Sequence, residues 1–301
     1  MEPMSGKIAD AHAPMRDAAF VVIGVPYDAT SSYRSGAKDG PAAIRRASYN
    51  FELWLLELGV DIEDIPFHDW GDIGEVFSPD ALVDAVAEAV REVASKRGRV
   101  PILIGGEHNA TEGAVRALKE AHGDLRVISF DAHTDFRKEY LDEPRSHACA
   151  MRRVSDIVGV GRVAVAGVRS SSSEEQADAR ELGYAFVTAD AVRGRGLDAV
   201  VDDLLARTGK GPLYLTLDLD VIDPSFAPGV QTPEPWGLTP LDIRHVIDRL
   251  APHLVGMDIM ECAPAHDGGQ TALLAARLLR HSIGAMWLSG QRRPRPRKAK
   301  W

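Results

Sequence analysis

The 301-residue sequence has only two cysteines, Cys149 and Cys262. Two cysteines cannot build the disulfide framework of a small secreted protein, so we expect both to be small buried residues in a reducing, cytoplasmic setting. No apolar run approaches the ~20 residues that a helix needs to cross a bilayer. The first fifteen residues contain acids and lack the apolar stretch of a signal peptide. We therefore predict a cytoplasmic protein with no membrane partner.

Basic residues are scarce outside the end of the chain. The sequence has 35 Lys and Arg residues against 44 Asp and Glu residues, a net charge of −9. Six of the basic residues and no acid lie in the Pro-rich segment 291–301, which is typical of a disordered extension. An acidic body disfavours nucleic acid as a partner of the main surface. It favours cations, namely metal ions, amines or guanidines.

Short apolar runs rich in Val and Ile alternate with amphipathic stretches along most of the chain. The candidate strands are 19–25, 100–104, 125–130, 162–167, 184–188, 212–217 and 253–260. Helical patterns cover 79–96, with Ser78 placed as N-cap, and also 239–250 and 271–279. This alternation predicts a parallel sheet with crossover helices on both faces. Without a Gly- and Pro-rich linker or an internal repeat, we predict one domain at 19–290, an N-terminal extension at 1–18 and a tail at 291–301.

Acidic residues and histidines directly follow four of these apolar runs. In a parallel sheet such residues gather at the carboxyl ends of the strands, where ligands bind. The residues in question are Glu107 and His108, then Asp131, His133 and Asp135, then Asp218 and Asp220, and finally Asp258 and Glu261.

Six of these side chains suit a metal site. Asp131, His133 and Asp135 alternate along an extended segment and therefore share one face, as do Asp218 and Asp220. A lone histidine or a lone Asp-x-Asp pair is commonly structural, but four carboxylates at one edge repel unless cations neutralise them. Together with His108 they suit Mn²⁺ or a similar divalent ion. Six ligands favour a pair of ions, which can lower the pKa of a shared water.

Several longer motifs resemble the ureohydrolase family of arginases and agmatinases. The motifs occur in the family's order from about residue 20 to residue 284, and within the family the sequence is most similar to archaeal-type agmatinases. Its strings are GVPYD, SYRSGAKDGPAAIR, GGEH, SFDAHTD, TLDLDVIDPSFAPGVQTPEP and MDIMECAPAHD. The resemblance implies a single three-layer α/β/α domain with a mainly parallel sheet, assembled as a homotrimer or homohexamer. It also implies hydrolysis of a guanidino group to urea and an amine.

The resemblance also implies roles for particular residues. Two Mn²⁺ ions per subunit are expected, with Asp131 and Asp218 bridging them. One ion would take His108, Asp131, Asp135 and Asp218, and the other Asp131, His133, Asp218 and Asp220. Glu261 would pair with the substrate guanidinium, and its alternative is an exposed acid at a strand end. His147 would pass a proton to the leaving amine, although Ala148 stands where the family usually has glycine.

The substrate is less constrained than the reaction. The loop after Asp135 resembles that of agmatinases, so agmatine is the expected substrate, and its hydrolysis would give putrescine and urea. The loop acids Glu139, Asp142 and Glu143 are candidates to bind the ammonium group of agmatine. Guanidinobutyrate, arginine or another guanidino compound are the alternatives. Trp236 and Asp39 depart from the family pattern near the expected pocket. A non-catalytic homologue acting as an assembly partner and another two-metal hydrolase, such as a phosphoesterase, are the remaining hypotheses.

Overall fold

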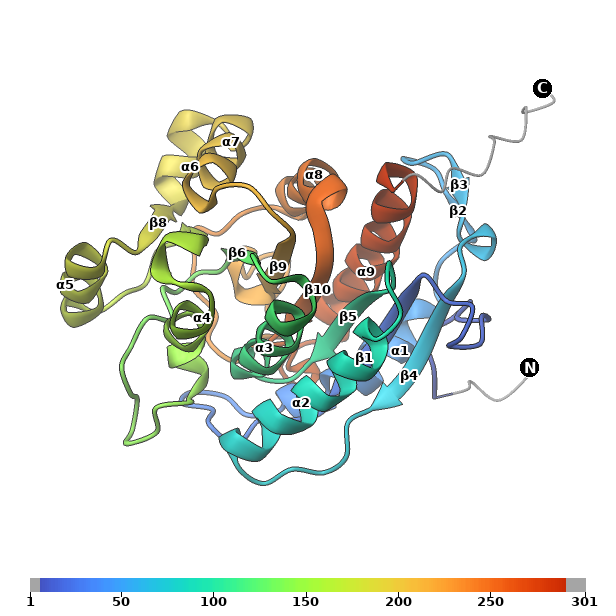
Figure 1. Ribbon diagram of the computed structural model, residues 1–301, viewed down its shortest axis with the longest axis horizontal. Helices are drawn as coiled ribbons and strands as arrows, with labels where there is room; N and C mark the ends of the chain where they lie inside the picture. Colours follow the sequence, from blue (N-terminus) through green and yellow to red (C-terminus); the bar gives the residue numbers. More distant parts are fainter. Residues whose placement is uncertain (1–5, 291–301) are drawn as a thin grey trace.

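Eight parallel strands form the centre of the protein, which a computed structural model describes over residues 6–290 (Figure 1). Their order in the sheet is β4-β1-β5-β10-β9-β6-β7-β8. The strands are β1 (Phe20–Val25), β4 (Phe67–Asp72), β5 (Val100–Gly105), β6 (Arg126–Phe130), β7 (Val163–Val168), β8 (Ala185–Thr188), β9 (Leu213–Asp218) and β10 (Leu254–Met260). A separate antiparallel pair joins β2 (Trp54–Leu55) to β3 (Val60–Asp61). The predicted mainly parallel sheet is confirmed.

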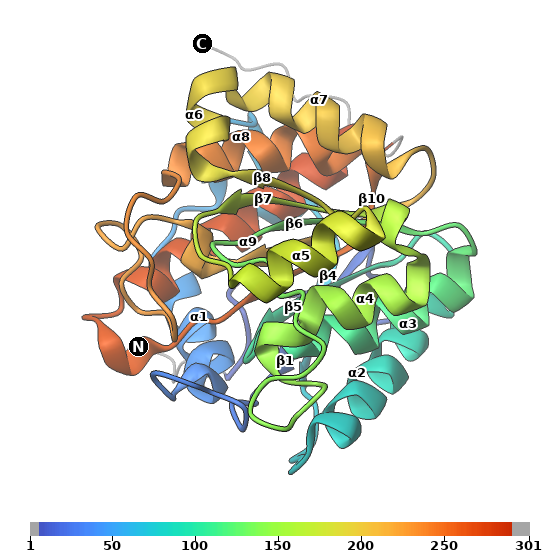
Figure 2. The same ribbon diagram turned by 90° about the vertical axis from the view of Figure 1, so that its left-hand side faces the viewer.

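Helices cover both faces of this sheet (Figure 2). One layer consists of α2 (Pro79–Ala94), α3 (Thr111–His122), α4 (Ala150–Val158) and α5 (Ser173–Leu182). The other consists of α1 (Gly40–Ser48), α6 (Ala189–Arg195), α7 (Leu197–Thr208), α8 (Pro240–Leu250) and α9 (Gln270–Ser289). Each layer encloses its own apolar core against the sheet. The strands β1, β7 and β9 are consequently buried along their whole length, as parallel strands covered on both faces must be.

All seven predicted strands are present, and each end lies within one residue of the prediction. The helix α2 begins as predicted, because the Ser78 hydroxyl accepts a hydrogen bond from the backbone N–H of Ala81 at 3.2 Å. In α8 the Thr239 hydroxyl and the Asp242 carboxylate cap each other's backbone N–H groups. Local patterning therefore places these elements correctly.

The strand β4 and the helix α9 differ from the sequence expectation, and the short pair β2 and β3 was not predicted either. The edge strand β4 has the sequence FHDWGD, which is too polar to be recognised as a strand. The helix α9 was expected to end at residue 279 but continues to Ser289. Arg280 and His281 interrupt its apolar pattern, yet both are buried because Arg280 pairs with Asp10 and His281 contacts Asp248.

The N-terminal segment packs against the body of the protein from residue 8 onward. The backbone N–H of Ile8 donates to Asp69 at 2.7 Å, and that of Ala9 donates to Ser48 at 2.8 Å. The basic tail at 291–301 lies outside the described residues. Among residues 6–290, none of the helices combines the length and apolarity required to cross a membrane.

The sheet order explains where the chemistry collects. The strands β5, β10, β9 and β6 are consecutive neighbours in the sheet. These are the four strands after which the candidate residues occur in the sequence. Because parallel strands end at the same edge, the side chains that follow them converge on one site.

Candidate metal centre and active site

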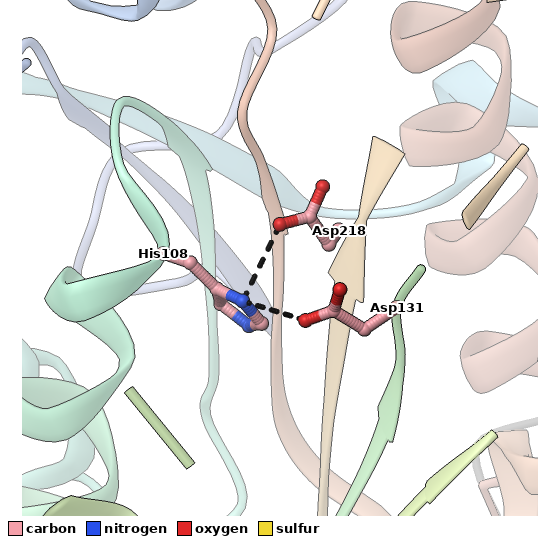
Figure 3. Close-up of side chains that lie close together, drawn as sticks. All are labelled: His108, Asp131 and Asp218. Carbon is pink, nitrogen blue, oxygen red and sulfur yellow. Dashed lines mark ion pairs between the residues drawn. The ribbon is translucent and has the colours of Figure 1, made fainter. Parts of the chain in front are cut away.

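His108 stands at the centre of three carboxylates. It follows β5 in a short 3₁₀ turn, and its Nδ1 lies 3.1 Å from Asp131 Oδ2, 3.0 Å from Asp135 Oδ2 and 3.3 Å from Asp218 Oδ2. Figure 3 shows Nδ1 directed toward the carboxylates of Asp131 and Asp218. A single ring N–H cannot satisfy three acceptors at once. This convergence is instead the arrangement of ligand atoms around a cation.

The other ring nitrogen of His108, Nε2, is hydrogen-bonded on the side facing away from the carboxylates. It lies 2.8 Å from the Thr216 hydroxyl, which itself donates to Asp258 at 2.5 Å. Asp258 also accepts hydrogen bonds from Thr111 and Tyr214, so it is fully engaged below the site and does not reach the edge expected from the sequence. Since the Thr216 proton goes to Asp258, the hydroxyl accepts from Nε2–H. In the neutral ring, the form that binds a metal, the lone pair of His108 Nδ1 therefore faces the carboxylates.

A second group of candidate ligands adjoins the first. His133 Nδ1 lies 2.9 Å from Asp220 Oδ2 and 3.6 Å from Asp131 Oδ1. Asp131 belongs to both groups, as a bridging ligand would. The backbone N–H of His133 donates to Asp131, and that of Asp220 donates to Asp218. These hydrogen bonds two residues apart fix both carboxylates at the strand ends.

Burial and mutual repulsion perturb the pKa values of these acids. Burial, followed by the charge of Asp131, raises the pKa of Asp135 to about 7. Burial and the charges of Asp220 and Asp131 raise the pKa of Asp218 well above its usual range. For Asp131, burial disfavours ionisation, but the imidazoles of His108 and His133 outweigh it and hold the pKa below its usual range.

The histidines show the complementary shift. Burial lowers the pKa of His108 and of His133, but the surrounding carboxylates outweigh burial and raise both values well above the ordinary one. Without a cation, protons must therefore bind here to balance four buried acids. Asp131 Oδ2 is buried and, within residues 6–290, has no hydrogen-bond partner. Oxygen-rich donors with two imidazoles fit divalent cations, so this site satisfies the chemistry of a two-metal centre.

Glu261 follows β10 and adjoins the ligand cluster. Its Oε1 accepts the backbone N–H of His108 at 2.7 Å, and its Oε2 is buried with no hydrogen-bond partner in the described part of the chain. Its backbone has φ +67, an unfavourable value for a side chain of this kind. Burial, then the charge of Glu107, raises the pKa of Glu261 well above its usual range. A buried carboxyl oxygen without a partner is available to a cationic ligand.

His147 lines the cavity that adjoins the ligand cluster, at the turn before α4. Its Nδ1 lies 3.2 Å from the Thr30 hydroxyl, and its Nε2 lies 3.3 Å from the Ser32 hydroxyl. Burial, followed by the nearby charge of His133, lowers the pKa of His147 to about 4. At pH 7 the free imidazole is therefore neutral and can accept a proton before it donates one.

A cavity of about 410 Å³ opens onto the ligand cluster. Its acidic lining residues are Asp135, Glu175, Asp218, Asp220, Glu234 and Glu261. Its basic lining residues are His133, Arg137 and His147. Arg137 lies 3.4 Å from the Glu175 carboxylate, so the charges of these two side chains largely cancel. The wall is thus predominantly acidic.

Several residues singled out from the sequence lie away from this cavity. The loop acids Glu139, Asp142 and Glu143 do not line it, whereas Glu175 and Glu234 do. Trp236 does not line it either. It is 75% exposed, and its carbonyl accepts a hydrogen bond from Arg193.

Sequence reasoning missed residues that support the site. Thr216 stands two residues before Asp218 inside a recognised motif, whereas Glu107 was expected at a strand end but was given no role. The Glu107 carboxylate accepts hydrogen bonds from Thr30 and Ser31, while burial raises its pKa to about 7. Glu234 lies in the TPEP string. Only the fold shows which of these side chains turn toward the ligands.

Comparison with known proteins identifies the family. The model of the arginase family matches residues 18–284, which is most of the chain. The chain belongs to the arginase family. This confirms the resemblance predicted from the motifs and agrees with a metal-dependent hydrolase.

Individual relatives narrow the likeness. The chain is 42% identical over 273 residues to an N(1)-aminopropylagmatine ureohydrolase of Thermococcus kodakarensis, covering 89% of this chain and 91% of the relative. It is 36% identical over 273 residues to an agmatinase of Pyrococcus horikoshii, covering 90% and 93%. The crystal structure of an agmatine ureohydrolase of Thermoplasma volcanium superposes with a TM-score of 0.89 at 40% identity, covering 95% of each chain. The three-layer fold is therefore confirmed.

Proposed function

We propose that this protein is a two-metal amidinohydrolase acting on agmatine or an N-substituted agmatine. Water adds its oxygen to the guanidinium carbon, the bond from that carbon to the substituted nitrogen breaks, and this nitrogen takes a proton. The products are urea and an amine, which is putrescine when agmatine is the substrate. The observation that carries the proposal is the cluster of five converging ligand residues, joined by Asp135 through His108, which opens into an acidic cavity beside Glu261.

The metals are proposed to be two Mn²⁺ ions per subunit. His108, Asp131, Asp135 and Asp218 would hold one, and Asp131, His133, Asp218 and Asp220 the other. Four carboxylates with two imidazoles match the oxygen-rich preference of Mn²⁺. When bound, such a pair supplies a water of lowered pKa, and thus hydroxide at neutral pH.

Two further side chains bind the substrate and transfer the proton. Glu261 Oε2 has no partner in residues 6–290, so it can accept the guanidinium N–H groups and orient the carbon for attack. His147 is neutral at pH 7 and presents its Nε2 toward the cavity. From there it can accept a proton as water adds and donate it to the departing nitrogen, because an amine anion is a very poor leaving group.

The charge of the cavity supports a dicationic substrate. Agmatine carries a guanidinium and a distant ammonium group, and beyond the ligand cluster the wall offers Glu234, whereas Glu175 is already engaged by Arg137. Arginine or guanidinobutyrate would instead bring a carboxylate into this wall. Within residues 6–290 the only lining residue with a permanent positive charge is Arg137, which is already paired with Glu175. The site therefore favours amines over guanidino acids.

The setting of the enzyme follows from the same reasoning. We infer a catalytic unit at residues 19–290, assembled as a homotrimer or homohexamer in the cytoplasm. The resemblance to ureohydrolases supports the assembly, and the acidic body of the chain argues against a nucleic-acid partner. Light scattering on the purified protein measures the subunit number.

Urea release from the Mn²⁺-loaded protein tests the proposal. Agmatine, N(1)-aminopropylagmatine, arginine and guanidinobutyrate are offered in parallel, and we expect the two amines to give the highest kcat/KM. Urea from a guanidino acid alone would contradict the substrate class but keep the reaction. No urea from any substrate, with two ions bound, would favour the non-catalytic homologue.

A further inference from the structure

Thr30 connects two buried groups from distant parts of the chain. It lies in the loop after β1, and its hydroxyl is 2.5 Å from Glu107 Oε2. The same oxygen lies 3.0 Å from the backbone nitrogen of His147 and 3.2 Å from His147 Nδ1. The backbone N–H of Thr30 donates to Glu107 Oε1 at 2.7 Å, so the loop is held at two points. One hydroxyl therefore has three polar neighbours.

The donors and acceptors of this arrangement can be assigned. A threonine hydroxyl has one proton and two lone pairs. Its proton goes to the Glu107 carboxylate at the shortest of the three distances. The backbone N–H of His147 can only donate, so it occupies one lone pair. The remaining contact, to His147 Nδ1, is a hydrogen bond only if Nδ1 carries a proton and donates it.

This assignment determines the state of the opposite nitrogen. A neutral imidazole with its proton on Nδ1 has a free lone pair on Nε2. His147 lines the cavity, and its Nε2 lies 3.3 Å from the Ser32 hydroxyl at the mouth. Ser146 Oγ, 3.3 Å from Nδ1, fits this tautomer as a second acceptor of the Nδ1 proton.

We infer that Thr30, itself held by Glu107, is a positioning residue that fixes the tautomer and the ring orientation of His147. The inference rests on the proposed function, in which His147 carries the proton. Thr30 acts through His147 and does not contact the substrate. In this arrangement the reactive nitrogen faces the cavity before the substrate arrives, and no ring rotation precedes proton transfer.

Two replacements of Thr30 distinguish positioning from packing. Thr30→Val keeps the shape of the side chain but has no hydroxyl, and Thr30→Ser keeps the hydroxyl but loses the methyl group. For Thr30→Val we expect kcat to fall by about 10- to 100-fold, the range typical of groups that orient catalytic ligands. KM, bound metal and melting temperature should stay at the wild-type values. Thr30→Ser should restore most of kcat.

A matched control removes a buried hydroxyl elsewhere. Thr208 lies at the end of α7, and its hydroxyl donates to the carbonyl of Leu204 at 2.8 Å. Thr208→Val should leave kcat and KM unchanged. Normal kcat in Thr30→Val would overturn the inference. Equal losses in Thr30→Val and Thr30→Ser, or loss of metal and melting temperature in Thr30→Val, would also overturn it, because they indicate a packing role.

A third variant keeps this test separate from the proposed function. His147→Ala should lower kcat at least as much as Thr30→Val does. Normal kcat in His147→Ala would refute the proton-transfer role of His147, and the inference with it. A low kcat in His147→Ala beside a normal kcat in Thr30→Val would refute only the role of Thr30.

Discussion

The hydroxyl of Thr216 lies 2.8 Å from Nε2 of His108 and donates its own proton to Asp258. A buried carboxylate thus sets the tautomer of a candidate metal ligand through an intervening hydroxyl. The pair formed by Thr30 and His147 repeats this arrangement on the other side of the cavity. In each case the threonine hydroxyl donates its proton to a carboxylate and accepts a hydrogen bond from a ring N–H of the histidine. The two histidines consequently present opposite nitrogens, Nδ1 of His108 to the candidate ligand carboxylates and Nε2 of His147 to the cavity.

Removing the Thr216 hydroxyl should weaken metal binding. In Thr216→Val, His108 Nε2 loses its acceptor and Asp258 loses one of its donors, so the ring is free to adopt the other tautomer. We expect the affinity for Mn²⁺ to fall by about 10- to 100-fold. Calorimetric titration of the metal-free protein measures this affinity. Thr216→Ser should bind as wild type does, and equal affinity in Thr216→Val would show that the hydroxyl does not orient His108.

Asp131 should be required for the binding of both ions, whereas Asp135 should be required for only one. Asp131 belongs to both groups of converging ligand atoms, and Asp135 contacts only the first through His108. We expect Asp131→Ala to lose both ions and all urea release. Asp135→Ala should retain one ion. Elemental analysis of the dialysed variants gives the stoichiometry, and two ions retained by Asp131→Ala would contradict the bridging role. Asp218→Ala tests the second proposed bridge in the same way.

Glu261 should affect turnover without affecting the metals. Its Oε1 contacts the backbone of His108, while its unpartnered Oε2 is free for the guanidinium. Glu261→Gln keeps the shape and removes the charge, so we expect about a 100-fold or greater loss of kcat/KM from the missing charge-assisted hydrogen bonds. The metal content should stay at two ions. Glu120→Gln, on the exposed face of α3, is the matched control, and unchanged kinetics in Glu261→Gln would remove its proposed role.

The sequence contained enough information to predict seven of the eight strands of the main sheet and to name the candidate ligands that the fold brings together. Apolar runs such as LRVISF and LYLTL are typical of buried strands. Chain connectivity then places the residues that follow them at the carboxyl ends of those strands. The motifs then predicted which acids and histidines act together. That the strands β5, β10, β9 and β6 are neighbours, however, is a property of the whole sheet. Periodicity carries no information on strand order.

Contacts between distant segments were the part that could not be predicted. Thr30 lies 117 residues from His147, and no spacing rule connects them. Asp258 was expected at the edge of the sheet with the other acids, but its strand places it below, where three hydroxyl groups engage it. Polarity was also misleading for β4, because Asp69 is buried within it through a specific pair with Arg45. Local composition cannot indicate which buried charges find partners.

The ion pair between Arg45 and Asp69 should be important for folding. Arg45 Nε lies 2.8 Å from Asp69 Oδ2, both side chains are buried, and Asp72 adds a second contact at 2.5 Å. Asp69 also accepts the backbone N–H of Ile8. Asp69→Ala leaves the buried guanidinium with only the partly exposed Asp72, so it should lower the free energy of unfolding by about 3 kcal/mol, the lower end for a broken buried pair. Urea denaturation measures this loss.

The exposed pair of Arg91 and Glu120 provides the comparison for this prediction. Its contact is as short as that of the buried pair, at 2.6 Å, but solvent surrounds both side chains. Glu120→Ala should therefore change stability very little. Similar losses in Asp69→Ala and Glu120→Ala would mean that burial does not determine the strength of the pair.

Metal binding should become tighter as the pH rises. In the metal-free protein the pKa of Asp135 is raised to about 7 by burial and by Asp131, and those of His108 and His133 are raised by the surrounding carboxylates. A raised pKa means that the group still holds a proton near neutrality, and a metal ion must displace that proton. The apparent affinity for Mn²⁺ should therefore increase from about pH 5 to about pH 8.

The same displacement should be visible as released protons. Calorimetric titrations in buffers of different ionisation enthalpy, at one pH, count the protons that leave on binding. We expect net release near pH 6 that diminishes at higher pH, as the sites lose their protons before the metal arrives. Asp135→Asn should release fewer protons than wild type, since an amide has none to lose in this range. An affinity independent of pH, with no release, would mean that the cluster is already ionised without metal, and that the buried acids are balanced by some other group.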